Sequence, residues 1–257
     1  MEETPTPINY CLHCSASLPT IAKFCSQCGT SVIVPVHKGV QKSVYYIIAF
    51  YLAFLLLAII NVAVFSNGFS FLSEVVVEAI FILMTLGFCL LDWKNIMKLY
   101  QLPHIEVKGV LMMFLVPIGS AFLVYYGIEW LNDALGWYDE NIFGEYIRYK
   151  NTLFWAILFT AILPPIFEEL AFRGFLFNEM RKVSSVQVTI IATSFLFALV
   201  HFSFISFIWI FPFGLFLGYL RQRYNTLWLS MVVHFIHNFI VLMLDYAYFN
   251  PNILEAF

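Results

Sequence analysis

Long apolar runs separated by short polar connections fill most of the chain after residue 43. A bilayer core about 30 Å thick needs about 20 mainly apolar residues in an α-helix that crosses it, and the runs approach this length. They predict seven membrane helices, over Val44–Phe65, Phe71–Leu91, Val110–Trp130, Thr152–Phe177, Val186–His201, Ser206–Leu220 and Leu227–Tyr248. We therefore predict an all-α fold, a multi-pass transmembrane helical bundle of about seven helices.

The boundary between the fifth and sixth runs, near Phe202–Phe204, carries no charged side chain. Backbone groups at membrane depth must find hydrogen-bond partners inside the protein, because lipid offers none. Two interpretations of this boundary therefore stay open at the level of sequence. It is either a tight turn between two helices or a re-entrant bend.

Basic residues gather in alternate connections between the predicted helices, and loops rich in lysine and arginine are retained on the cytoplasmic side. With the N-terminus inside, the cytoplasmic connections hold Lys38, Lys42, Lys94, Lys98, Lys108, Arg181, Lys182, Arg221 and Arg223. The predicted external loop is mostly acidic, through Asp133, Asp139, Glu140 and Glu145. We expect a multi-pass membrane protein, in the plasma membrane if the chain is prokaryotic, with a cytosolic N-terminus and an external C-terminus.

Composition supports the membrane interpretation and limits the partners. Of the 257 residues, 61% are hydrophobic and 11% are charged, far from the composition of a soluble domain. The formal net charge of -3 offers no concentrated basic surface, so we expect contact with the lipid bilayer and no nucleic-acid partner. No internal repeat is apparent in the sequence. This disfavours an ion-coupled transporter built from repeated halves.

Four of the five cysteines lie within the first thirty residues, as the pairs Cys11-x-x-Cys14 and Cys25-x-x-Cys28. Two such turns can offer four thiolates to one tetrahedral zinc ion. The spacing therefore predicts a cytosolic zinc ribbon over residues 1–35, followed by a linker over residues 36–43. A structural Zn²⁺ would supply most of its folding free energy, about 10 kcal/mol or more. The alternatives are two disulfides or a redox pair.

Ionisable side chains inside a bilayer are costly unless they are paired or hydrated, so each one is a candidate for function. Glu168 and Glu169 are adjacent in the fourth run, and Arg173 follows four residues after Glu169. Residues four apart share a helix face, so Glu169 and Arg173 can pair while Glu168 points elsewhere. Such a pair can also serve only to lock helices together. The sequence therefore predicts one neutralised carboxylate and one free carboxylate.

Two histidines and an asparagine follow in the later runs. His201 ends the fifth run, and His234 and Asn238 lie one turn apart in the last. Peptide hydrolysis needs an activated water and donors for the developing oxyanion, and these residues with Glu168 supply both. Glu168, His201 and His234 would equally suit an active-site Zn²⁺ with an open position for water. The sequence leaves both mechanisms open, and a single membrane histidine can also be a structural hydrogen bond between helices.

Three further polar residues lie inside apolar runs. His237 has a different helical angle from His234, which indicates a structural or supporting role. Glu74 and Glu78 lie one turn apart in the second run. They mark either a hydrated end of that helix or a polar wall that faces substrate.

Three short strings occur in order: Glu168-Glu169-Leu-Ala-Phe-Arg173, Phe197-Ala-Leu-Val-His201 and His234-Phe-Ile-His-Asn238. They resemble the motifs EExxxR, FxxxH and HxxxN of the CPBP family, the CAAX-protease and bacteriocin-processing membrane endopeptidases, also called Abi. The resemblance covers the region from Thr152 to Val241. The N-terminal ribbon differs from the eukaryotic prenyl-protein endopeptidases and is similar to that of prokaryotic members with a fused zinc ribbon.

The resemblance implies an all-helical intramembrane protease whose catalytic core lies over residues 151–250. It implies that Glu168 and His201 activate the attacking water. The resemblance also implies that His234 and Asn238 stabilise the oxyanion. The family has been described both as metalloproteases and as metal-free glutamate proteases, so the resemblance leaves an active-site metal open.

The resemblance gives Glu169 and Arg173 a supporting role in the site and leaves residues 44–150 as N-terminal membrane helices with the external loop. The leading hypothesis is a membrane endopeptidase that acts on a peptide or protein substrate at the membrane. The alternative is a non-catalytic membrane scaffold or immunity-type protein. In either case the ribbon can bind a cytosolic protein partner.

Overall fold

The computed structural model describes residues 10–11, 13–18, 24–30, 38–65, 70–135, 142–202 and 204–250. Parts of the predicted ribbon and linker, and Asp139 and Glu140 of the predicted external loop, lie outside these residues. The chain divides into two compact units, Met1–Lys42 and Ser43–Phe257. The described residues contain no β-strand beyond isolated bridges such as that between Tyr10 and Ser17. The all-α prediction is therefore confirmed.

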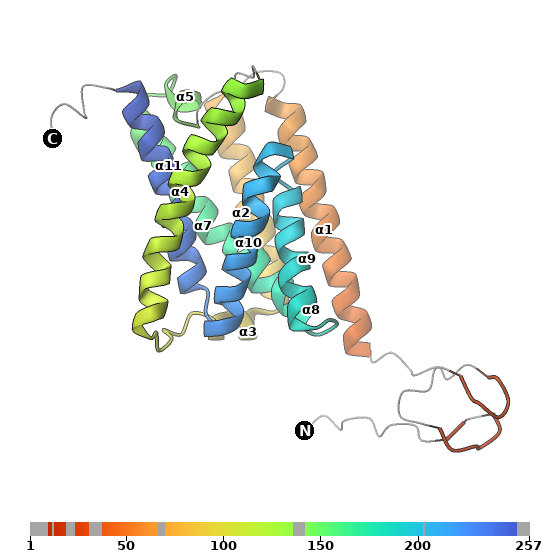
Figure 1. The fold of residues 1–257 in the computed structure, drawn as a ribbon. Coiled ribbons are helices and arrows are strands. Elements are labelled where there is room, and N and C mark those ends of the chain that lie inside the picture. The colour runs from red at the N-terminus through yellow and green to blue at the C-terminus, as the bar shows by residue number, and fades with distance from the viewer. Residues whose placement is uncertain are drawn as a thin grey trace. The chain divides into compact units, whose positions relative to one another are not determined.

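A helix corresponds to each of the seven predicted membrane segments (Figure 1). These helices are α1 (Lys38–Phe65), α2 (Phe71–Leu91), α4 (Val107–Leu135), a continuous helix over Thr152–Arg181, α9 (Val186–Leu199), α10 (Phe204–Tyr224) and α11 (Trp228–Phe249). Short helices α3 (Trp93–Lys98) and α5 (Ile142–Tyr146) lie in connections. Among the described residues, 5 helices are long and apolar enough to cross a membrane: α1, α2, α4, the Thr152–Arg181 helix and α11. The protein is thus a multi-pass membrane protein.

α9 is shorter than the sequence predicts. Its 14 residues rise about 21 Å, less than the roughly 30 Å of a bilayer core. It ends at Leu199, Phe202 adopts a positive φ of 51°, and α10 begins at Phe204 and packs along α9. The boundary between the two helices is therefore a tight turn, and Figure 1 shows it recessed below the ends of α1, α4 and α11. His201 lies in this recessed turn.

The helix over Thr152–Arg181 is not a regular α-helix. It consists of α6 (Thr152–Ala156), the π-helical turn η1 (Ile157–Ile162), α7 (Leu163–Glu168), the π-helical turn η2 (Glu169–Leu176) and α8 (Phe177–Arg181). Pro164 and Pro165 lie at the start of α7 and have no N–H to donate to the preceding turn. π-turns inside α-helices are frequent at functional sites. Every residue of η2 is buried, so this segment forms the centre of the bundle.

A cluster of phenylalanine rings joins the first two helices to η2. Phe50 of α1 stacks on Phe54 with ring centroids 4.1 Å apart, and it meets Phe172 of η2 edge-on at 5.5 Å. Phe88 of α2 lies 5.3 Å from Phe175 of η2. Lipid tails are as apolar as these side chains, so there is no hydrophobic driving force between helices in a membrane. Close packing of this kind is therefore what holds the helices together. α1 and α2 are thereby held against the helix that carries the EExxxR residues.

Candidate active site

Glu169 and Arg173 form a buried ion pair at the centre of the bundle, as their spacing predicts. Arg173 Nη1 donates to Glu169 Oε1 over 2.9 Å, and both side chains are fully buried. Arg173 Nη2 donates to the carbonyl of Gly214 in α10 over 3.2 Å, and the guanidinium lies 4.2 Å from the ring centroid of Phe197 in α9. The guanidinium thus contacts three helical segments. A buried charge needs such partners, because an ion in a low-dielectric interior is otherwise desolvated without compensation.

His234 of α11 binds to the same pair. Its Nδ1 lies 3.1 Å from Glu169 Oε1. A carboxylate only accepts hydrogen bonds, so Nδ1 carries the proton and, in the neutral ring, Nε2 has the lone pair. Nε2 lies 3.9 Å from Glu168 Oε2. Glu169 therefore orients the His234 ring toward Glu168, as outer carboxylates orient functional histidines in other proteins.

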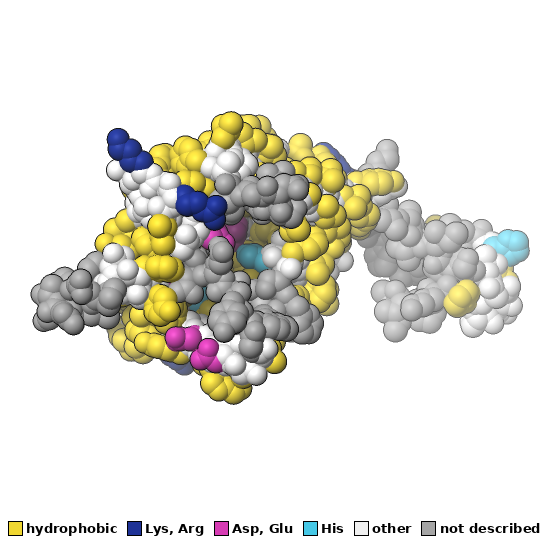
Figure 2. Space-filling view, turned by 90° about the horizontal axis from the view of Figure 1, so that it is seen from above, with side chains coloured by type: hydrophobic (Ala, Val, Ile, Leu, Met, Phe, Trp, Pro, Cys, Tyr) yellow, Lys and Arg dark blue, Asp and Glu magenta, His cyan; other side chains and the backbone are white. Residues whose placement is uncertain are grey.

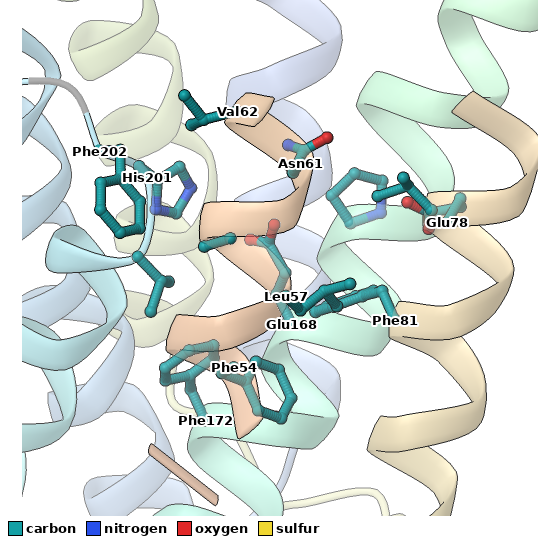
Figure 3. A pocket seen from close by; sticks show the side chains of 14 residues that line it. Phe54, Leu57, Asn61, Val62, Glu78, Phe81, Glu168, Phe172, His201 and Phe202 are labelled. Atoms are coloured by element: carbon teal, nitrogen blue, oxygen red, sulfur yellow. The ribbon is translucent and has the colours of Figure 1, made fainter. Parts of the chain in front are cut away.

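Glu168 and His201 line one cavity of about 270 Å³ (Figure 3). Glu168 is the accessible member of the Glu-Glu pair, with 20% of its side chain exposed. His201 Nδ1 donates to the carbonyl of Phe197 over 2.7 Å, which leaves Nε2 as an acceptor in the neutral ring. Figure 3 shows both side chains directed into the same space from α7 and from the turn after α9. A water molecule in this cavity would therefore meet a carboxylate and an imidazole.

His234, His237 and Asn238 of α11 are not among the residues that line this cavity, although His234 Nε2 lies 3.9 Å from Glu168 Oε2. Asn238 Nδ2 donates to the carbonyl of Thr160 in η1 over 3.0 Å. His237 Nδ1 lies 2.9 Å from Ser120 Oγ of α4, and its ring packs on Phe213 with centroids 4.5 Å apart. His237 therefore joins α11 to α4 and α10. Asn238 keeps one further amide N–H for another acceptor.

The N-terminal unit brings Cys11, Cys14, Cys25 and Cys28 together, with their sulfur atoms all within 4.8 Å of one another. Cys11 Sγ lies 3.7 Å from Cys28 Sγ, and Cys14 Sγ lies 3.5 Å from Cys25 Sγ. Such separations fit four thiolates around one zinc ion with Zn–S bonds of about 2.3 Å, and the cysteines are not in disulfides. The Thr30 hydroxyl beside the Cys28 thiol lowers the pKa of Cys28 to about 6. The cluster fits a structural zinc ribbon.

Glu168, His201 and His234 do not form a second group of this kind. Among the described residues, only the four cysteines form a group of three or more possible metal ligands whose ligand atoms all lie within 4.8 Å of one another. Glu168 and His234 approach each other to 3.9 Å, but the three residues together are more widely spread. An active-site Zn²⁺ held by these three side chains stays a prediction, and the arrangement does not fit it without movement of a side chain.

Two polar residues from the first two helices line the same cavity. Glu78 of α2 is one of the two acidic residues for which the sequence allows two roles, and Asn61 of α1 belongs to no motif. An amide in the middle of an apolar run is a signal that could have found Asn61, because such groups are costly in a bilayer. In Figure 3, Glu168 lies between His201 on one side and Glu78 on the other.

Together these contacts define a multi-pass helical membrane protein with a buried carboxylate and histidine centre beside a cavity. Residues 150–240 match the family described as Type II CAAX prenyl endopeptidase Rce1-like, and residues 10–32 match the zinc-ribbon domain family. No curated protein and no solved structure matches the chain. The resemblance found from the motifs is therefore confirmed over residues 150–240, and the match over residues 10–32 agrees with the predicted zinc ribbon.

Proposed function

We propose that this protein is an intramembrane endopeptidase that hydrolyses peptide bonds with a water activated by Glu168 and His201. The observation that carries the proposal is that these two side chains line one cavity inside an Rce1-like domain. The proposed substrate is a peptide or protein segment at the membrane. The protease would be of the glutamate type, because the carboxylate and imidazole already face a common space.

The proposed reaction moves one proton from the water and returns it to the leaving group. Glu168 takes a proton from water while His201 Nε2 orients it, and the hydroxide oxygen attacks the carbonyl carbon of the scissile bond. His234, when protonated at Nε2, would donate to the oxyanion, because this atom lies 3.9 Å from Glu168 Oε2. Asn238, which does not line the cavity, would support the site through its bond to the carbonyl of Thr160. Glu168 then gives its proton to the leaving amine as the C–N bond breaks. Glu169 would hold the His234 ring in the orientation that donation to the oxyanion needs.

The test is cleavage of a peptide library by purified protein and by two variants. Glu168→Gln keeps the shape of the side chain but cannot accept the proton, and His201→Ala removes the second acceptor. We expect each to lower kcat/KM by about 100-fold or more with an unchanged melting temperature. His104→Ala is the matched control, because His104 is an exposed histidine in the connection before α4. Variants that cleave as fast as the parent would refute the proposal.

We also propose that the end of the bundle with the basic connections faces the cytosol. Lysine and arginine in short loops set the orientation of membrane helices in this way. The zinc ribbon precedes α1, whose first turns carry Lys38 and Lys42. A thiolate zinc site suits the reducing cytosol.

A further inference from the structure

The basic connections lie together at one end of the bundle. Lys182 Nζ lies 3.6 Å from Asp92 Oδ1, and Thr226 Oγ1 donates to the carbonyl of Leu99 over 2.9 Å. These contacts join the connections that follow α2, α8 and α10. The described basic residues at this end of the second unit are Lys94, Lys98, Lys108, Arg181, Lys182, Arg221 and Arg223. At the opposite end, the described connection after α4 holds Arg148 and Lys150 with Glu145.

The cavity that contains Glu168 belongs to the opposite half of the bundle. Its floor comes from Pro164, Glu168 and Phe172 in the middle of the Thr152–Arg181 helix. The rest of its wall comes from the second half of α1, the first half of α2 and the end of α9 with the turn after it. These wall segments of α1, α2 and α9 are remote in their helices from the basic connections. Figure 2 views the bundle from the end away from those connections and shows acidic and histidine side chains in a hollow near the middle of that face. The hollow therefore opens toward the less basic end.

We propose that the substrate peptide enters from the non-cytoplasmic side of the membrane. The reasoning joins the direction of the cavity to the positive-inside rule, which assigns the basic end to the cytosol. The substrate class is then an exported segment of a membrane or secreted protein, and not a tail presented from the cytosol. This inference rests on the proposed endopeptidase function.

The test uses a membrane-impermeant maleimide on the full-length protein in intact and permeabilised cells, with labelled sites identified by mass spectrometry. Phe202→Cys and Val62→Cys place thiols at exposed positions of the cavity wall. Gln222→Cys places one at the basic end of α10. We expect the two cavity cysteines to react in intact cells and Gln222→Cys to react only after permeabilisation. The reverse pattern, or cavity cysteines that need permeabilisation, would overturn the inference.

Labelling requires no catalysis, so failure of the orientation and failure of the function are distinguishable. The same cysteines in a Glu168→Gln background should label as before. If Glu168→Gln still cleaves peptides while the labelling pattern holds, the proposed function fails and the orientation stands. If cleavage is lost but the labelling pattern is reversed, only the side of entry is wrong.

A second inference concerns the two polar residues in the cavity wall outside the matched family region. Asn61 Oδ1 and Glu78 Oε1 are buried, and neither has a hydrogen-bond partner among the described residues. The cavity is lined by two carboxylates and by no lysine or arginine. An acceptor at membrane depth without a donor is costly, so these oxygens are suited to a ligand that brings donors.

We infer that Asn61 and Glu78 bind a lysine or arginine side chain of the substrate beside the scissile bond. This also rests on the proposed function. The test compares peptides that differ by lysine and norleucine at one position, with the parent and with Glu78→Gln. We expect the ratio of kcat/KM for the lysine peptide over the norleucine peptide to fall about tenfold in Glu78→Gln. An unchanged ratio, or a parent enzyme that shows no preference for lysine at any position, would overturn the subsite. If Glu168→Gln abolishes cleavage in the same experiment, the proposed endopeptidase function still stands.

Discussion

Asn238 of α11 donates its amide N–H to the carbonyl of Thr160, 3.0 Å away in η1. In an α-helix this carbonyl would accept from residue 164, and in a π-turn it would accept from residue 165. Both residues are prolines and have no N–H. Asn238 therefore replaces a backbone hydrogen bond that the two prolines remove, and it joins the last helix to the helix that carries Glu168.

Asn238→Ala should lower stability as well as activity. It leaves a carbonyl at membrane depth without a donor, so we expect a loss of about 1–3 kcal/mol in the free energy of unfolding. Thermal unfolding in detergent would measure it. Asn250→Ala is a matched control, because Asn250 Nδ2 makes a bond of the same length, 3.0 Å, to Tyr246 at the end of α11. An Asn238→Ala variant as stable as the parent would contradict the structural role.

Arg173→Met should be strongly destabilising. It leaves the fully buried Glu169 carboxylate without its cation, and removal of one partner of a buried pair typically costs about 3–5 kcal/mol. Arg223→Met is the comparison, because the Arg223 and Glu106 side chains are 55% and 69% exposed. There we expect a change of about 1 kcal/mol or less. Similar losses in the two variants, measured by denaturation in detergent, would argue against the buried pair.

Gly214→Ala should disturb the Arg173 guanidinium from the side of α10. A Cβ at Gly214 would lie 3.1 Å from Ser194 Cβ and 3.2 Å from Arg173 Nη2, which is closer than most side chains tolerate. We expect lower activity and a lower melting temperature. Gly119→Ala in α4 is the matched control, because its Cβ would meet nothing within 4 Å. That variant should be neutral or gain about 0.5–1 kcal/mol, since alanine favours a helix over glycine.

Full-length protein should contain one zinc ion per chain, held by the four clustered cysteines. Cys25→Ser removes a buried ligand, so metal analysis of the purified variant should find the zinc lost. Cys89→Ser should keep it, because Cys89 lies in α2 and outside the cluster. Zinc retained in Cys25→Ser would indicate a metal site elsewhere, and the residues named for an active-site zinc would be the first to examine.

Features that depend on neighbouring residues could be predicted from the sequence. The length of the apolar runs determines where membrane helices form, because burial in lipid and backbone hydrogen bonding are local requirements. The spacing of Cys11 and Cys14 predicts a metal-binding turn, because the two ligands are only three residues apart in the sequence. The four-residue spacing of Glu169 and Arg173 predicts their pair, which has an N–O distance of 2.9 Å.

Relationships between distant segments were decided only by tertiary structure. Packing of α11 against the helix with the EExxxR residues selects Glu169 as the partner of His234 Nδ1, 65 residues away in sequence. The packing of α1 and α2 brings Asn61 and Glu78 to the cavity of Glu168, although no motif connects them. Helical periodicity reports which residues share a face, whereas the partner of that face depends on how helices far apart in the chain pack together.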